Sequence, residues 1–158
     1  TSCGLPDAPF TATIGRVGVR QEGTSVMAVV TLQVATNRQS SLEDITSRVQ
    51  QAVRESGVRD GLCLIYVPHT TAGLLINENA DPSVAADILA ALDRLVPRQG
   101  PYRHLEGNAA AHIKASLVGT SQTLIVRDGQ LALGTWQGIY LAEFDGPRQR
   151  RVLLSIRP

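Results

Sequence analysis

Near the start of the chain, apolar and polar residues alternate as they do in half-buried β-strands. Two segments, residues 10–20 and 25–36, carry this pattern with many β-branched residues, and Glu22-Gly23 stands at a turn between them. The pattern predicts a β-hairpin. The preceding residues 1–9 contain two prolines and no periodicity, which is typical of a loose leader.

Helical spacing of apolar residues follows the hairpin. Leucine, isoleucine and valine recur at this spacing from residue 42 to residue 56, and Asp44 stands three positions after Ser41, as in a capping box. Gly57 is a suitable residue just beyond a helix end. We therefore expect a first helix over residues 42–56.

A nearly continuous apolar run comes next. Residues 61–67 have the length and composition of a central strand that is covered on both faces, and residues 72–76 form a second short strand. Asp81 then precedes a proline and a helical pattern over residues 82–96.

A third, short helix is predicted to begin after Asn108 and to end at Gly119. Strand patterns then return, with Asp128-Gly129 as a tight-turn signal, over residues 123–127, 130–133, 139–144 and 151–156. The order ββαββαα followed by β-strands predicts an α+β fold, a single compact domain over residues 10–158 with about three helices on a mixed sheet.

Composition narrows the range of partners. The 158 residues carry a net charge of +1 and only 4% aromatic residues, so neither a basic surface nor stacking platforms for nucleic acid are expected. No apolar run approaches the ~18 residues of a membrane span, and we expect a cytoplasmic protein without a membrane partner. Cys63 lies in an apolar run and is expected to be a buried thiol, while nothing indicates whether Cys3 pairs.

The three histidines suggest where chemistry takes place. His69, His104 and His112 lie in polar segments outside the apolar stripes, which indicates a metal or acid/base site. If Asn108 is the N-cap of the third helix, His104 lies in the preceding loop and can fold back toward His112. Three imidazoles suit Zn²⁺ with a water in the open position, whereas structural hydrogen bonding by the histidines is the plain alternative.

Several side chains near these histidines are candidates to assist. Glu78 or Glu106 would orient or deprotonate a metal-bound water. The alternative is a solvated carboxylate at a strand end for Glu78 and a helix-dipole partner for Glu106. Trp136 stands between residues that allow close approach of a ligand, or it simply packs.

A second group of polar side chains suits an anion. Thr70 and Thr71 offer hydroxyls and turn amides, and Lys114, Ser116 and Thr120 extend the set. An ordinary Ser/Thr turn is the alternative.

Three ordered blocks of sequence carry a family resemblance. They are HTTAGLLINENADPSVAADILAALDRLVP, YRHLEGNAAAHIKASLVGTS and LGTWQGIYLAEFDGPRQRRV. Together they closely resemble the YjbQ-like family, an uncharacterised protein family that is also called secondary thiamine-phosphate synthase. The resemblance runs from His69 to Val152 and more loosely back to Phe10.

This resemblance implies a barrel-like sheet with helices, a homotrimer with pockets near subunit boundaries, and a metal ion at His69, His104 and His112. It places further residues at the family's motif positions, as candidates to line the pocket: Asn77, Glu78, Asp81, Glu106, Asn108, Lys114, Ser116, Trp136 and Gln137.

The family name implies that an aminopyrimidine diphosphate is joined to a thiazole phosphate and that pyrophosphate leaves. On this reading Glu78, Glu106 and Lys114 are catalytic, zinc is the favoured ion, and magnesium is the alternative because phosphates are usually handled through it. The expected ligand is a phosphorylated small molecule, bound by Thr70, Thr71, Asn77, Asn108, Ser116, Trp136 and Gln137. A non-catalytic trimeric module that binds a metal or metabolite, and a purely structural role of the histidines, remain open.

Overall fold

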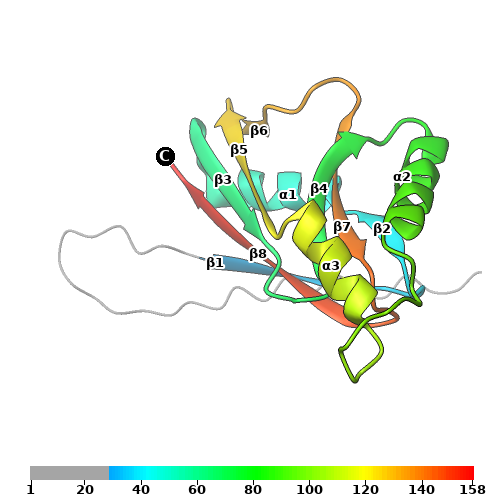
Figure 1. Ribbon diagram of the computed structural model, residues 1–158. Coiled ribbons are helices and arrows are strands. Elements are labelled where there is room, and N and C mark those ends of the chain that lie inside the picture. The colour runs from blue at the N-terminus through cyan, green and yellow to red at the C-terminus, as the bar shows by residue number, and fades with distance from the viewer. Residues whose placement is uncertain (1–28) are drawn as a thin grey trace, which may run out of the picture.

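The computed structural model describes residues 29–158, which form three helices and eight strands (Figure 1). The strands are β1 (Val29–Ala35), β2 (Ser41–Asp44), β3 (Gly61–Tyr66), β4 (Ala72–Glu78), β5 (Ser121–Arg127), β6 (Gln130–Leu131), β7 (Gln137–Glu143) and β8 (Gln149–Arg157). The helices are α1 (Thr46–Ser56), α2 (Pro82–Leu95) and α3 (Ala109–Val118). The α+β class and the number of helices expected from the sequence are confirmed for this part of the chain.

The strands form two sheets. The larger has the order β1-β8-β3-β5-β6 and curls like half of a barrel, and the smaller has the order β2-β7-β4 (Figure 1). The barrel-like curl agrees with the expectation, but every pairing among the described strands is antiparallel where a mixed sheet was expected. The reason is that, within residues 29–158, the helical connections run from one sheet to the other, and no strand-helix-strand crossover joins neighbours within a sheet.

Apolar side chains are arranged in two clusters. The main one lies between the inner face of the large sheet, α1 and one face of the small sheet, and the second lies between the other face of the small sheet and helices α2 and α3. Strand β7 is therefore buried on both faces. The prediction that residues 61–67 are covered on both faces was wrong, because Leu62 and Tyr66 of β3 are 48% and 44% exposed.

The first helix is shorter than the sequence predicted. It begins at Thr46, and Ser41–Asp44 forms strand β2, which pairs with β7. The expected capping box is absent because the Ser41 hydroxyl donates to Glu43, while Asp44 Oδ1 accepts the N–H of Thr46 at 2.8 Å. Edge pairing with β7 outweighs the local helical pattern.

The later elements agree closely with the sequence. Asp81 caps α2 by accepting the N–H of Ser83, and the Asp128-Gly129 turn joins β5 to β6 with both residues at positive φ. Asn108 occupies the N-cap position of α3, but its side chain makes no capping hydrogen bond. Gly57 follows α1 in the left-handed conformation, as expected.

The predicted leader and the predicted strand over residues 10–20 lie outside the described residues, as does Cys3. Cys63 is a free, buried thiol, and burial raises its pKa to about 11. Among residues 29–158, the helices are too short or too polar to cross a membrane.

Candidate functional site

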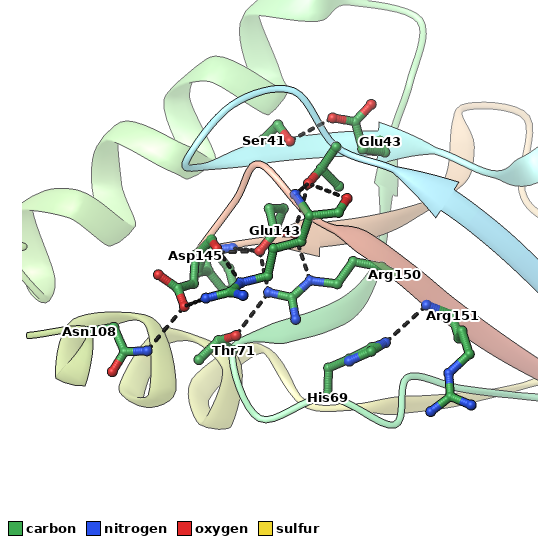
Figure 2. A network of polar contacts seen from close by, with 12 residues as sticks. Ser41, Glu43, His69, Thr71, Asn108, Glu143, Asp145, Arg150 and Arg151 are labelled. Atoms are coloured by element: carbon green, nitrogen blue, oxygen red, sulfur yellow. Dashed lines mark hydrogen bonds and ion pairs between the residues drawn. The ribbon is translucent and has the colours of Figure 1, made fainter. Parts of the chain in front are cut away.

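His69 lies in the loop between β3 and β4, beside strand β8. Its Nε2 atom accepts a hydrogen bond from the backbone N–H of Arg151 at 2.9 Å (Figure 2). Burial lowers the pKa of His69, and the positive charges of Arg150 and Arg151 lower it further. The ring is therefore held neutral, with its proton on Nδ1, because the lone pair of Nε2 is engaged.

His104 and His112 meet at the start of α3. Their rings are in edge-to-face contact with centroids 5.1 Å apart, His112 on the second turn of the helix and His104 in the loop before it. The sequence had predicted that this loop can fold back. Glu106 stands next to the pair, with Oε2 3.7 Å from His104 Nε2.

A hollow of about 480 Å³ connects His69 with His112. Thr70, Ser116 and Thr120 also line it, and the Ser116 hydroxyl donates to the carbonyl of His112 at 2.9 Å. The loop after β3 forms one side of the hollow and α3 with the residues after it forms the other. Two of the predicted ligand-binding side chains, Thr70 and Ser116, thus lie on one hollow together with two of the predicted metal ligands, His69 and His112.

Lys114 lies on a different face of α3. It is buried, its ammonium group pairs with Asp93 of α2, and it lines a second hollow of about 430 Å³ together with Glu106 and Asn108. Within one chain, Lys114 therefore opens onto a different hollow from His69 and His112.

Glu78 and its neighbours lie far from the histidines in the same chain. Strand β4 begins at Ala72, next to the His69 loop, and ends at Glu78, and six residue steps of a strand span about 20 Å. Asn77 Oδ1 accepts the N–H of Glu78, and Gln137 Oε1 accepts the N–H of Gly134. Trp136 is 63% exposed at this end.

Because of these separations, a single chain does not bring all the predicted site residues together. Within residues 29–158, no group of three His, Cys, Asp or Glu side chains is arranged to hold a metal ion. The three histidines are nevertheless linked through the hollow and the ring contact, and their role stays a prediction.

A buried network beside His69 was not foreseen from the sequence (Figure 2). Arg150 binds Glu143 with two hydrogen bonds, Nε to Oε2 at 2.7 Å and Nη2 to Oε1 at 2.5 Å, and both residues are buried. Burial raises the pKa of Glu143, but the hydrogen bonds and charge of Arg150, with the N–H of Asp145 and the hydroxyl of Thr36, outweigh burial and hold the pKa below its usual value.

The network extends to Thr71 and to the start of α3. Arg150 Nη2 donates to Thr71 Oγ1 at 2.8 Å, and Asn108 Nδ2 donates to Asp145 Oδ2 at 3.0 Å. One signal could have revealed the network in advance, because Glu143 interrupts an apolar strand and a buried carboxylate needs a partner.

The curled antiparallel sheet, the small second sheet and the histidine-lined hollow place this chain in an α+β class that has known relatives. The family model "UPF0047 protein YjbQ-like" matches residues 30–158. A UPF0047 protein of Methanocaldococcus jannaschii is 57% identical over 124 residues, which cover 78% of this chain and 90% of that protein. YugU of Bacillus subtilis is 54% identical over 127 residues, 80% of this chain and 96% of the relative.

Solved structures agree. A YjbQ/UPF0047 family protein from Clostridium acetobutylicum has a TM-score of 0.79 and 54% identity, and the match covers 80% of this chain and 98% of that one. A hypothetical protein from Aeropyrum pernix has a TM-score of 0.80 and 38% identity, with 83% and 98% covered. The chain belongs to the YjbQ-like UPF0047 family.

Proposed function

We propose that this protein binds a divalent metal ion through His104, His112 and His69 and acts on phosphorylated small molecules at the adjoining hollow. The observation that carries the proposal is the contact between His104 and His112. Two imidazoles bound tetrahedrally to one zinc ion at about 2.0–2.1 Å have ring centres about 5 Å apart, and the observed separation is 5.1 Å. Zinc is the favoured ion and magnesium the alternative.

His69 is the proposed third ligand. A neutral imidazole offers one lone pair, and the His69 lone pair is engaged with the N–H of Arg151. Metal binding by His69 therefore requires this hydrogen bond to be exchanged for the metal. The lowered pKa of His69 favours the neutral ring that such an exchange needs.

The hollow offers suitable partners for a phosphate. Thr70 and Thr120 line it, and hydroxyls donate readily to phosphate oxygens, whereas the Ser116 hydroxyl already donates to the carbonyl of His112. The reaction proposed is the family's weak thiamine-phosphate synthase activity, in which a thiazole nitrogen replaces pyrophosphate on an aminopyrimidine diphosphate. An ion held by the histidines would supply charge stabilisation for the leaving pyrophosphate, and the Glu106 carboxylate would lie beside it, with Oε2 3.7 Å from His104 Nε2.

A second candidate is a metal- or metabolite-binding module without catalysis. This candidate is favoured because the predicted catalytic groups Lys114 and Glu78 do not lie together at the histidines. Lys114 is paired with Asp93 on another hollow, and Glu78 lies at the far end of β4. A single chain thus places neither group beside His69.

The proposed assembly is a homotrimer. The proposed location of the protein is the cytoplasm. The outer face of the large sheet exposes apolar side chains in the chain as described, with Leu62 at 48% and Ile125 at 54%. An exposed apolar patch on a sheet suits an interface, and a second copy could bring the missing catalytic groups to the hollow.

The test is a product assay. The full chain, loaded with zinc or magnesium, is incubated with the aminopyrimidine diphosphate and the thiazole phosphate, and thiamine phosphate is quantified by fluorescence after oxidation. We expect metal-dependent product that is lost in His112→Ala and kept in Glu55→Ala, which changes an exposed residue of α1. Absence of product, together with stabilisation by metal that depends on His112, would favour the binding module.

A further inference from the structure

Arg150 is connected to His69 along two paths (Figure 2). Its own Nη2 atom donates to the hydroxyl of Thr71, two residues after His69. The next residue along β8, Arg151, donates its backbone N–H to the His69 ring. His69, Thr71, Arg150 and Arg151 thus close a loop of contacts in which both the backbone and the ring of His69 are held.

The guanidinium of Arg150 is a rigid anchor for this loop. The residue is 4% exposed, and its partner Glu143 is fully buried. A buried charge is tolerated only when it is paired and hydrogen-bonded, and a bidentate arginine-carboxylate pair fixes both distance and orientation. The side chain therefore has little freedom to leave Thr71.

Glu143 is itself held from the opposite side. Oε2 accepts the hydroxyl of Thr36 at 2.9 Å, and Oε1 accepts the backbone N–H groups of Phe144 and Asp145. Two buried threonines therefore contact the same ion pair. Thr71 connects it to the His69 loop, whereas Thr36 connects it to the chain after β1.

We propose that Arg150 is a positioning residue, which fixes the His69 segment through Thr71 and the His69 ring through the adjacent N–H of Arg151. The inference rests on the proposed function for the role of His69 as a ligand, but the positioning itself does not require a metal. Outer partners that orient a metal-binding histidine are worth about 10–100-fold in metal affinity.

The two threonines provide a matched pair of variants. Thr71→Val removes the hydroxyl that accepts from Arg150 and keeps the shape of the side chain. Thr36→Val removes the hydroxyl on the Glu143 side of the same ion pair, together with its hydrogen bond from the backbone N–H of Arg148, without touching the His69 loop. Thr71→Ser restores the hydroxyl and serves as the conservative rescue.

Two measurements are made on the full chain. The first is the ¹⁵N and ¹H NMR signature of the His69 ring in metal-free protein, which reports the tautomer and the hydrogen bond to Arg151. The second is zinc affinity by competition with a chelator. For Thr71→Val we expect loss of the single Nδ1–H signature and zinc affinity lower by about tenfold or more, while Thr36→Val and Thr71→Ser resemble the wild type in both.

Equal effects of Thr71→Val and Thr36→Val would show that the ion pair acts only on stability and would overturn the proposal. So would a wild-type His69 signature and affinity in Thr71→Val. If wild-type protein binds no zinc, the proposed function fails, and the NMR comparison in metal-free protein still decides whether Arg150 positions His69.

Discussion

His69 Nε2 lies 2.9 Å from the backbone nitrogen of Arg151 and accepts its hydrogen. Residues 82 positions apart in sequence are thereby joined at the edge of the hollow that His112 also lines. The bond fixes which ring nitrogen carries the proton, which decides how His69 can interact with a ligand.

The first prediction concerns the protonation of His69. In metal-free protein its pKa lies below the ordinary value of 6.5, because burial and the charges of Arg150 and Arg151 oppose protonation. The folded-state pKa is lowered, so the stability from a neutral His69 is present above pH ~6.5 and is lost as the pH falls through the folded-state value. NMR titration of the ring measures this pKa, and a value at or above 6.5 would contradict the description.

The buried ion pair gives the second prediction. Glu143→Gln leaves the buried charge of Arg150 without its counterion and should lower the free energy of unfolding by about 3–5 kcal/mol. The double variant Glu143→Leu, Arg150→Met leaves no unpaired charge and should recover much of that loss. Denaturant unfolding measures the free energy of unfolding of both variants. Equal stability of the single and double variants would contradict the prediction that the unpaired charge of Arg150 causes the loss.

The same pair predicts how stability changes in acid. The pKa of Glu143 is lowered in the folded state, so its contribution is complete above the unfolded-state value of ~4.3 and decreases as the pH falls through the folded-state value. The wild type should lose stability in this range more steeply than the double variant. Parallel profiles for the two proteins would argue against an ionised Glu143.

Close packing of β4 against the end of α3 gives the fourth prediction. A Cβ atom on Gly73 would lie 2.7 Å from the carbonyl oxygen of Gly119, a backbone atom that cannot turn away. Gly73→Ala should therefore cost about 1–3 kcal/mol of unfolding free energy. Gly100→Ala, which meets only the side chain of Tyr102, is the control, and a similar cost for both in thermal or denaturant unfolding would contradict the packing.

Much of the fold could be predicted from the periodicity of apolar residues and from the residues that cap helices and form turns. Asp81 followed by proline located α2, and Asp128-Gly129 located the β5–β6 turn, because in both places local chemistry and tertiary structure agree. Strand β2 was missed because Leu42 fits a helical spacing and only pairing with β7, nearly one hundred residues later, makes this segment a strand.

The site was only partly predictable. The polar surroundings of the histidines drew attention to them, and the structure brings His112 into contact with His104 and into one hollow with His69. Glu143 and Arg150 were missed because their significance lies in burial, which single-sequence patterns do not report. The separation of Glu78 from His69 follows from the course of β4, which continues to Glu78 beyond the strand predicted over residues 72–76.

The proposed trimer is tested on the open face of the large sheet. Tyr66, which also lines the hollow beside His69, is 44% exposed there, and Tyr66→Glu places a charge on an apolar patch. Light scattering should show dissociation to smaller species, with far-UV circular dichroism unchanged. Glu55→Gln on α1 should leave the assembly intact, and an unaltered mass of the Tyr66 variant would exclude this face as the interface.

The most direct test of a metal centre is the metal content of untagged protein by elemental mass spectrometry, for the wild type and His112→Ala at matched oligomeric state. We expect close to one zinc or similar ion per chain, or per site after reconstitution, and its loss in His112→Ala. Wild-type protein without bound metal after reconstitution, or His112→Ala with undiminished metal, would contradict it.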